Sequence, residues 1–417
     1  MKYGLLGRKL SHSLSVPIHR AFFERRRLAD SYELLELEPD QVRNLRALME
    51  AEGFGALNVT IPYKQAVMPL CDELTDSAQR VGAVNTLLRK GGRLIGHNTD
   101  WYGFEALLAH AGVEPKGRVC AVLGATGGAA KAATQALRAG GAELYLVSRQ
   151  GPMTYDDLSR ADFDLLVNCT PVGMFPDIDA SPVPREVAAR ADVLDMIYNP
   201  AETALMANAR AAGRRAENGL YMLVAQAVAA EAFWRGEPID RDAIRFIYAQ
   251  MRGIALIGLP GSGKTTLGQG LAALIGRPFV DLDRAIELET GRTIPELFKQ
   301  GEACFRDAES AAVRRHAGQY AVLSCGGGVV KRDENVRALR AGGLVIFLDR
   351  PTCRILSDID VSGRPLLAGG AARLYALERE RRALYERAAH ITVKNDAGPE
   401  EALQALARAV KTWAHNG

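Results

Sequence analysis

The chain has 417 residues, enough for two or three domains that each bury a core of their own. Hydrophobic residues make up 48% of the sequence and charged residues 24%, which is typical of a soluble globular protein. The formal net charge of +3 is too small to indicate a nucleic acid or a membrane surface as a partner.

The six cysteines are scattered along the chain, without a CxxC pair and without the spacing of a metal site. They indicate reduced thiols in a cytoplasmic protein. The chain does not open with a signal-like segment, and none of its apolar runs approaches the length of a membrane span. We therefore expect a cytoplasmic protein that does not bind membranes.

The first hundred residues begin with a short apolar strand, Tyr3–Gly7, and continue to a predicted helix from Pro17 to Arg27. Between them, Ser11, Ser13 and Ser15 bring three hydroxyl groups to the start of the helix. These hydroxyls could cap the helix or hold a small anion beside its first N–H groups, and capping is the more ordinary role.

Three later strand ends in the same segment carry polar side chains. A strand from Asn58 ends in a proline turn that is followed by Lys64. The segments Gly82–Thr86 and Gly96–Asp100 supply an amide, Asn85, and a carboxylate, Asp100. A lone lysine is usually a solvated surface charge, but a lysine, an amide and a carboxylate around a small oxygenated ring make an acid/base site.

In order and spacing, these motifs resemble shikimate dehydrogenase, and the resemblance extends from Tyr3 to about Gly236. It implies that Lys64 exchanges a proton with the ring oxygen and that Asp100 is its partner. It also implies that Ser13 and Ser15 bind the substrate carboxylate. The ring hydroxyls would be bound by Asn58, Thr60 and Asn85.

A second predicted domain starts with the buried strand Arg118–Leu123, which runs into a glycine loop and an alanine-rich helix. The loop would bind a dinucleotide through Gly124, Ala125, Thr126, Gly127 and Gly128. Alone it is a weak signal, because Thr126 replaces the second glycine of the usual fingerprint and a tight βα turn has the same composition. The next strand ends in Ser148 and Arg149, and an arginine at this place suits a 2′-phosphate, which favours NADP(H).

The segments Asn168–Met174 and Asp195–Pro200 again resemble shikimate dehydrogenase, in which such strand ends line the nicotinamide side of the site. The resemblance implies cofactor contacts from Met196 and Gly219, and substrate contacts from Tyr198 and Gln226. Gln226 is the polar exception in a helix that otherwise reads as core. Tyr221 departs from the family, which often has a smaller residue there.

A third predicted domain opens with the strand Ile254–Ile257, the loop Gly258–Thr266 and a helix, the order that a phosphate-binding P-loop requires. Lys264 would reach the β- and γ-phosphates, and the Thr265 hydroxyl would ligate magnesium. A glycine turn that binds nothing is the alternative, and the flanking strand and helix count against it. The remaining phosphate contacts would come from Gly261, Ser262, Gly263 and Thr266.

Further along, Asp281 and Asp283 are expected on alternate positions of a strand end, one for the metal and one for a hydroxyl acceptor, although an exposed strand end reads the same. The whole segment resembles shikimate kinase, with Ala383 where that family usually has proline. The resemblance implies Asp281 and Thr265 as magnesium ligands and Arg364 closing over ATP. It also implies shikimate contacts from Asp283, Arg306, Gly327 and Arg381.

We therefore predict an α/β protein with a substrate domain at 1–100, completed by helices at 219–250, and a Rossmann-type NADP domain at 101–218. A P-loop, NMP-kinase-like domain follows at 253–417. The expected reactions are reduction of 3-dehydroshikimate with NADPH and phosphorylation of shikimate with ATP and Mg²⁺. The alternatives are an NAD-dependent quinate/shikimate dehydrogenase in the first half, or one half without activity. Either a monomer or a homodimer fits the sequence.

Overall fold

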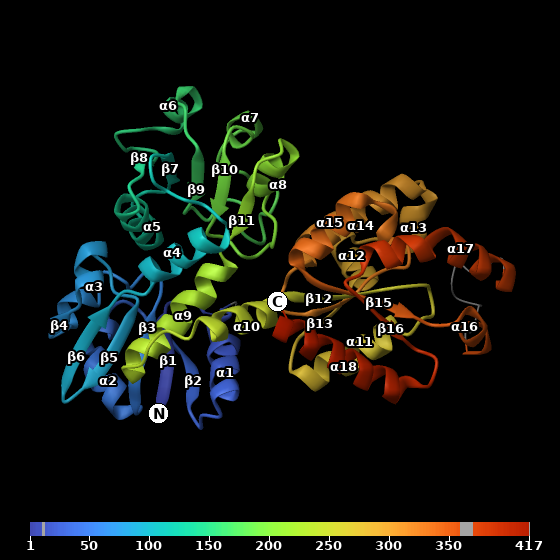
Figure 1. Ribbon diagram of the computed structural model, residues 1–417, viewed down its shortest axis with the longest axis horizontal. Helices are drawn as coiled ribbons and strands as arrows, with labels where there is room; N and C mark the ends of the chain where they lie inside the picture. The colour runs from blue at the N-terminus through green and yellow to red at the C-terminus, as the bar shows by residue number, and fades with distance from the viewer. Residues whose placement is uncertain (11–12, 359–369, 417) are drawn as a thin grey trace. The chain divides into compact units, whose positions relative to one another are not determined.

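The computed structural model describes residues 1–10, 13–358 and 370–416. It forms two compact units, the first made of Met1–Tyr198 with Thr203–Met251, and the second of Asn199–Glu202 with Arg252–Gly417 (Figure 1). The first unit holds two sheets and the second unit holds one. The fold is α/β, as the sequence predicts. Among the described helices, none is long and apolar enough to cross a membrane.

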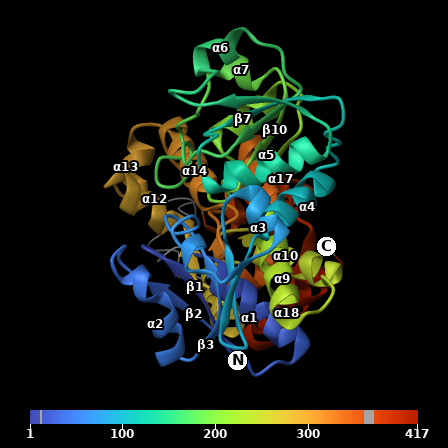
Figure 2. The ribbon, with the colours of Figure 1, turned by 90° about the vertical axis from the view of Figure 1, so that its left-hand side faces the viewer.

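The first sheet has six strands in the order β2-β1-β3-β5-β6-β4. The first three strands are parallel, whereas β5 runs antiparallel to both β3 and β6. Strand β1 is hydrogen-bonded to both β2 and β3, and Figure 2 shows α2 beside these strands. The elements of this part are β1 (Lys2–Gly7), α1 (Ser15–Arg26), β2 (Ser31–Glu36), η1 (Gln41–Asn44), α2 (Leu45–Ala51), β3 (Phe54–Val59), η2 (Met68–Leu70), β4 (Glu73–Leu74), α3 (Asp76–Val81), β5 (Thr86–Lys90), β6 (Arg93–His97), α4 (Asp100–His110), α9 (Leu220–Arg235) and α10 (Arg241–Met251).

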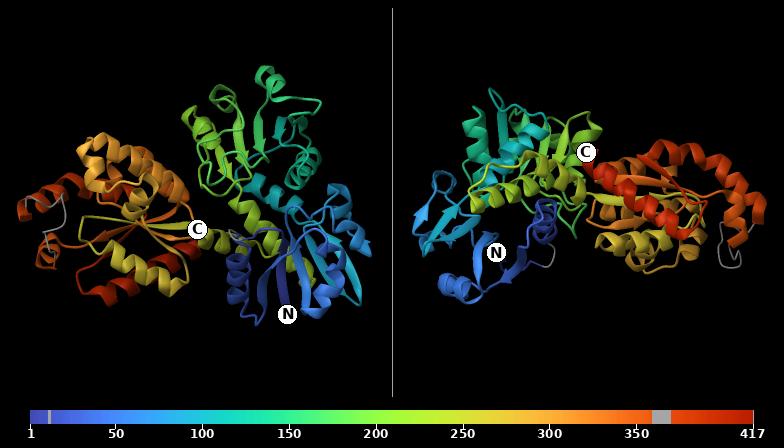
Figure 3. Two further views of the ribbon diagram at one scale, coloured as in Figure 1. Left: turned by 180° about the vertical axis from the view of Figure 1, so that it is seen from behind. Right: turned by 60° about the horizontal axis from the view of Figure 1, so that its bottom comes forward.

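The second sheet has five parallel strands in the order β11-β10-β9-β7-β8. One face packs on α4 and α5, and the other packs on α6, α7 and α8 (Figure 3). Its elements are β7 (Val119–Leu123), α5 (Gly128–Ala139), β8 (Glu143–Val147), α6 (Tyr155–Arg160), β9 (Leu165–Asn168), α7 (Arg185–Ala188), β10 (Asp192–Asp195), α8 (Ala204–Ala211) and β11 (Ala216–Asn218).

The third sheet also has five parallel strands, in the order β13-β14-β12-β15-β16. Helices α11 and α18 cover one face, and α12, α14, α15 and α17 cover the other. Its elements are β12 (Gly253–Ile257), α11 (Lys264–Ile275), β13 (Phe279–Asp281), α12 (Leu282–Thr290), α13 (Ile294–Lys299), α14 (Glu302–His316), β14 (Val322–Ser324), η3 (Val329–Lys331), α15 (Asp333–Gly342), β15 (Gly343–Asp349), α16 (Thr352–Asp358), α17 (Gly370–Ala388), β16 (Ile391–Lys394) and α18 (Pro399–Asn416).

The central parallel strands are short, apolar and buried on both faces, as the helix-covered sheets of α/β proteins require. In β12, for example, all five residues are buried. Polar groups are therefore carried by the loops at the strand ends, where ligands bind in this class of fold. Many candidate residues named from the sequence follow these strands or open the next helix, whereas Gln226, Arg306 and Arg381 lie within helices.

Because the units have separate apolar cores, a cavity in one core should destabilise that unit alone. Leu271 on α11 and Leu165 on β9 are both fully buried, one in each unit. We expect Leu271→Ala to lower the free energy of unfolding of the second unit by about 2–5 kcal/mol. Hydrogen exchange followed by mass spectrometry on peptides from each unit measures this.

Leu165→Ala is the matched control, and it should accelerate exchange in the first unit only. Equal acceleration in both units for either variant would contradict independent cores.

Candidate active sites

The first candidate site is centred on a lysine–aspartate pair. Lys64 follows β3, and Asp100 is the first residue of α4. Lys64 Nζ lies 2.6 Å from Asp100 Oδ2, and the two side chains are only 16% and 7% exposed. An ammonium group this far from water needs a paired carboxylate. The structure thus joins the two residues that were predicted as partners from segments 36 positions apart.

Two amides lie together in the same unit. Asn85 Oδ1 accepts a hydrogen bond of 2.8 Å from the backbone N–H of Thr99, so its Nδ2 points the other way. That Nδ2 lies 3.0 Å from Thr99 Oγ1 and 3.3 Å from Gln226 Oε1. The predicted residues Asn85 and Gln226 are therefore neighbours. Thr99 was not predicted as a site residue, although it lies between two quoted motif residues.

The helix next to the two predicted serines begins earlier than expected, at Ser15 rather than near Pro17, so Ser13 precedes it. Its N-cap residue, Leu14, makes no side-chain capping bond. Instead, Ser13 Oγ accepts the Ser15 N–H at 3.2 Å, and the two hydroxyl oxygens are 3.1 Å apart. One hydroxyl thus satisfies an N–H at the helix start, and both remain close enough together to bind one carboxylate.

The glycine loop after β7 fits a dinucleotide. Gly124 has a φ of 73°, and a Cβ atom there would lie 2.8 Å from Thr170 Cγ2, so only glycine suits this turn. The loop leads into α5, whose first N–H groups have no partners within the helix and can receive a pyrophosphate. A Cβ at Gly128 would lie 3.2 Å from Lys64 Cδ. The loop therefore lies beside Lys64, the residue that was predicted to act as acid and base.

The remaining cofactor candidates lie at the ends of β8 and β10. A Cβ at Gly219 would be 2.2 Å from the carbonyl oxygen of Met196, so these two residues are packed together. Arg149 is exposed. Tyr198 is half-buried, and burial raises the pKa of its phenol. Ser148 donates its N–H to the Met153 carbonyl at 3.1 Å, which closes the short loop after β8.

Behind this edge lies a buried carboxylate that sequence reasoning missed. Asp195, at the end of β10, is fully buried. Its oxygens accept hydrogen bonds from Asn168 Nδ2 at 3.0 Å, from the Ile197 N–H at 3.1 Å and from Thr203 Oγ1 at 2.7 Å. Burial outweighs these bonds and raises the pKa of Asp195 to about 6. The network orders the turn that leads from β10 to Met196.

The second unit contains the predicted P-loop. Gly261 and Gly263 have φ values of 80° and 92°, which turn the backbone N–H groups of the loop inward. Lys264 is 8% exposed and donates from Nζ to the carbonyl oxygens of Gly258 at 3.0 Å and Leu259 at 2.7 Å. The ammonium thus lies across the loop. Asn395, which was not predicted, donates from Nδ2 to the Ser262 carbonyl at 3.0 Å and braces the loop from β16.

The predicted metal ligands are adjacent in this unit. Thr265 Oγ1 donates to Asp281 Oδ2 at 2.9 Å, so a hydroxyl and a carboxylate meet at the mouth of the P-loop. Hard oxygen donors of this kind suit Mg²⁺, which keeps several waters and takes its other ligands from phosphates. Among the described residues, no group of three or more His, Cys, Asp or Glu side chains could hold a metal. The Thr265 hydroxyl and the Asp281 carboxylate fit a magnesium ion that arrives with the nucleotide and takes its other ligands from phosphates and water.

One local prediction was wrong. Asp281 and Asp283 do not alternate along a strand, because β13 ends at Asp281 and Asp283 lies in the first turn of α12. Asp281 is the N-cap residue of this helix, and its Oδ1 accepts the N–H groups of Asp283 and Arg284 at 3.1 and 3.2 Å. Burial, and secondly the charge of Asp281, raise the pKa of Asp283.

The predicted substrate arginines converge on the glycine loop after β14. Arg381 donates to the Gly327 carbonyl at 3.1 Å. A Cβ at Gly328 would lie 2.4 Å from Arg306 Nη1, and one at Gly326 would lie 2.8 Å from Asp283 Oδ1. All four predicted shikimate contacts of this unit therefore border one loop.

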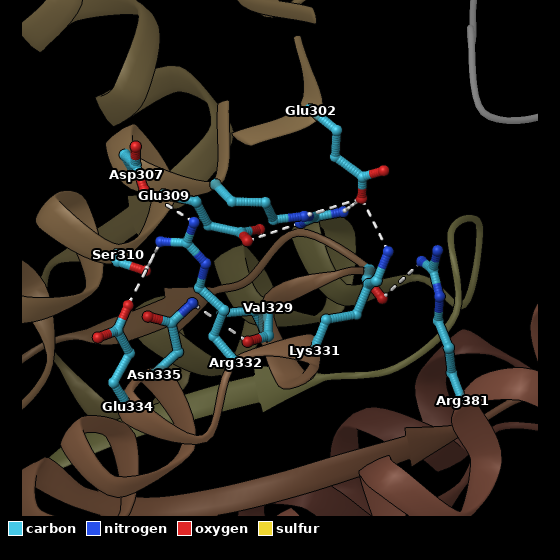
Figure 4. A network of polar contacts seen from close by, with 12 residues as sticks. Glu302, Asp307, Glu309, Ser310, Val329, Lys331, Arg332, Glu334, Asn335 and Arg381 are labelled. Carbon is cyan, nitrogen blue, oxygen red and sulfur yellow. Dashed lines mark hydrogen bonds and ion pairs between the residues drawn. The ribbon is translucent and has the colours of Figure 1, made fainter. Parts of the chain in front are cut away.

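Acidic side chains hold Arg306 in place. Arg306 Nη1 lies 2.6 Å from Glu309 Oε2, and Arg306 Nη2 lies 3.3 Å from Glu302 Oε1. The same Glu302 oxygen accepts a hydrogen bond from Lys331 Nζ at 2.7 Å (Figure 4). Burial raises the pKa of Glu309, whose second oxygen has no hydrogen-bond partner among the described residues. Glu302 and Glu309 were not singled out from the sequence. Arg364, predicted to close over ATP, lies outside the described residues.

The buried carboxylate Asp195 should make the stability of the first unit fall as the pH rises. Its pKa is raised from an ordinary value of 3.8, so the folded chain binds this proton more tightly than the unfolded chain. The stability that this proton contributes is complete below about pH 4 and is lost as the pH rises through about 6. We expect the first unit to lose on the order of 2–3 kcal/mol from pH 4 to pH 7, relative to Asp195→Asn.

Urea unfolding of both proteins across this pH range measures the difference. Asp162→Asn, which changes an exposed carboxylate near the same sheet, is the control and should keep the wild-type slope. Parallel stability curves for the wild type and Asp195→Asn would contradict the prediction.

Two family models match the chain. The model of the shikimate dehydrogenase substrate binding domain matches residues 5–87, and the model of shikimate kinase matches residues 260–411. The first range runs from within β1 to the start of β5 and includes Ser13, Asn58 and Lys64, and the second includes most of the P-loop and the loop after β14. Each match therefore covers part of a candidate site described above.

Relatives and solved structures support the first of these matches. The shikimate dehydrogenase (NADP(+)) of Clostridium beijerinckii is 37% identical over 261 residues, which cover 59% of this chain and 96% of the relative. A chorismate mutase/shikimate 5-dehydrogenase fusion protein from Clostridium acetobutylicum is 40% identical with a TM-score of 0.57, covering 59% of this chain and 95% of that one. Shikimate 5-dehydrogenase from Thermus thermophilus, in complex with NADP(H) and shikimate, is 32% identical with a TM-score of 0.52, covering 60% and 98%. The chain belongs to the shikimate dehydrogenase family and carries a shikimate kinase domain after it, which makes it a bifunctional enzyme of the shikimate pathway.

Proposed function

We propose that the Lys64–Asp100 pair performs the proton transfer when 3-dehydroshikimate is reduced to shikimate with NADPH. The observation that carries this proposal is the position of Lys64, which is bonded to Asp100 at 2.6 Å and packed against Gly128 at the start of the dinucleotide helix. A proton donor beside the cofactor loop is what carbonyl reduction requires. The substrate carboxylate binds Ser13 and Ser15.

In this proposal NADPH supplies the reducing equivalents, and the residues of the chain orient the ring and manage its proton. Asn58, Thr60, Asn85 and Gln226 hold the ring hydroxyls, and Tyr198 closes the site on the side of Met196 and Gly219. Lys64 donates its proton to the ring oxygen during reduction and takes it back in the reverse direction. Asp100 keeps the ammonium in place between these steps.

We propose that the second unit transfers the γ-phosphoryl group of ATP to the 3-hydroxyl of shikimate. Lys264 and the N–H groups of the P-loop bind the phosphates, while Thr265 and Asp281 hold magnesium, which offsets phosphate charge. Asp283 accepts the hydroxyl proton, a role that suits a carboxylate whose pKa is raised by burial. Arg306 and Arg381 bind the substrate carboxylate, because guanidinium groups form paired bonds with carboxylates.

For the organisation of the chain we propose a substrate domain at 1–100 with helices at 219–250, an NADP domain at 101–218 and a kinase domain at 253–417. The separate sheets and the unit boundary after Met251 support this division. The six cysteines form no disulfides, which supports a cytoplasmic setting.

Each of the two lysines, Lys64 and Lys264, should be needed for only one of the two reactions. Lys64→Ala should lower the rate of 3-dehydroshikimate reduction by about 10²–10⁴, because a positioned acid/base group is lost. Phosphorylation of shikimate by the same protein should remain at the wild-type rate. Lys264→Ala should have the converse effect and abolish phosphorylation while NADPH oxidation continues.

Two spectrophotometric assays, one for each substrate, measure both rates on each variant. Lys90→Ala, which removes an exposed lysine of the first sheet, is the control and should keep both activities. Near-normal reduction by Lys64→Ala would remove this lysine from the mechanism.

Arg149 should determine the preference for the phosphorylated cofactor. If its guanidinium binds the 2′-phosphate, Arg149→Ala should raise the KM for NADPH by about tenfold or more, because a charge-assisted hydrogen bond is lost. The KM for NADH, which lacks this phosphate, should change little. Steady-state kinetics with both cofactors measure the difference.

Arg138→Ala, which changes an exposed arginine on α5, controls for loss of charge near the cofactor domain. Equal losses with NADPH and NADH in Arg149→Ala would show that Arg149 has a structural role instead.

A further inference from the structure

We propose that Tyr32, which is not among the predicted site residues, is a positioning residue of the dehydrogenase site. Its buried hydroxyl fixes the orientation of the Asn58 amide, so that Asn58 offers N–H donors to the substrate. The inference rests on the proposed role of Asn58 as a substrate contact. It adds a residue that acts on Asn58 without contacting the substrate.

The hydrogen bonds around Asn58 define the orientation of its amide. Tyr32, on β2, donates its hydroxyl to Asn58 Oδ1 at 2.8 Å. The other end of the amide, Nδ2, lies 3.4 Å from both the Asn85 carbonyl and Thr86 Oγ1. An N–H···O bond is strong at about 2.7–3.2 Å, so both contacts of Nδ2 are long. The carbonyl end of the amide is thus occupied, and the donor end is the one left for a ligand.

Tyr32 is held in this position by its surroundings. Its ring stacks on the His19 imidazole, with 3.9 Å between the ring centres and 9° between the planes. His19 Nδ1 lies 2.6 Å from Glu231 Oε1, and this glutamate side chain is fully buried on α9. Glu231 Oε2 in turn accepts a hydrogen bond from Arg235 Nε at 3.0 Å. The phenol is thus fixed from behind by α1 and α9.

The phenol stays protonated at every pH at which the enzyme can work. Burial, and secondly the charge of Glu231, raise the pKa of Tyr32 well above its ordinary value. A neutral phenol has one proton to donate, and here it goes to Asn58. Loss of this bond would leave a buried amide oxygen without its partner and would free the amide to rotate.

The test uses Tyr32→Phe in the full chain, because phenylalanine keeps the ring that stacks on His19 and removes only the hydroxyl. We expect the KM for shikimate in the dehydrogenase reaction to rise about tenfold. The KM for NADPH, the kcat and the kinase activity should stay within about twofold of wild type. A tyrosine that only packs would change stability without changing the KM for one substrate.

Tyr63→Phe is the matched control. Tyr63 lies in the turn after β3, is also buried in the core of the first sheet and donates its hydroxyl, but to the Leu37 carbonyl. This variant should keep the wild-type KM for shikimate. An unchanged KM in Tyr32→Phe, or an equal rise in both variants, overturns the proposal.

A double-variant cycle shows whether Tyr32 acts through Asn58. In an Asn58→Ala background, where KM is already raised, Tyr32→Phe should cause no further increase. The same tenfold factor in both backgrounds overturns the proposal. If Asn58→Ala alone leaves the KM unchanged, the assignment of Asn58 as a substrate contact is wrong instead, which separates the two failures.

A third variant covers the case in which Tyr32→Phe does not fold. Asn58→Asp keeps an acceptor for the Tyr32 hydroxyl and removes the N–H donors, so its KM for shikimate should rise at least as much as in Asn58→Ala. A wild-type KM in Asn58→Asp would show that the substrate does not use these donors, and it would overturn the proposal.

Discussion

The contact between Lys64 and Asp100 is the constraint on which the dehydrogenase site depends. A largely covered ammonium group needs a carboxylate beside it, and Asp100 supplies that carboxylate at 2.6 Å. Asp100 opens α4, so the pair fixes the start of this helix against the turn after β3. Helix α4 packs on both α5 and α9. The same pair thereby places the helix behind the dinucleotide loop and the helix that carries Gln226.

In both units the functional polar groups lie near the ends of parallel strands. Parallel strands buried on both faces leave no room for functional side chains within the sheet, so these side chains gather where the strands end. In the first unit the ends of β3 and β7 bring Lys64 beside Gly128. In the second unit the ends of β12 and β13 bring Thr265 beside Asp281. Short glycine loops then let phosphate groups approach the backbone.

The α/β class and the P-loop could be predicted, because a P-loop requires a fixed order of strand, loop and helix. The pairs Lys64–Asp100 and Thr265–Asp281 could be expected because the resemblance to the two families implies them. The position of Asp283 in a helix could not be predicted. Asp281 caps that helix, and the sequence does not distinguish an aspartate that caps a helix from one that ends a strand. Likewise, the start of α1 at Ser15 depends on Ser13, which takes over the role of the cap.

The residues that the sequence did not reveal are mostly single polar groups in apolar surroundings. Tyr32, Asp195 and Glu309 each lie on a strand or helix whose pattern predicts core packing. Their partners are distant in the sequence or hidden by the fold, as with His19 and Glu231, which are 212 positions apart. Nothing in a local pattern distinguishes a tyrosine that packs from one that also donates a hydrogen bond. Only the three-dimensional arrangement provides that information.

Both units place a buried tyrosine behind a group proposed to bind substrate. In the second unit, Tyr385 is fully buried, stacks on Phe347 and donates its hydroxyl to the Gly327 carbonyl, next to Arg381. In the first unit, Tyr32 does the same for Asn58. A tyrosine suits this position because its ring fills core volume while its hydroxyl fixes a backbone or amide carbonyl. A loop or an amide that is oriented before the substrate arrives loses less entropy on binding, so these buried hydroxyls act on affinity without contacting the ligand.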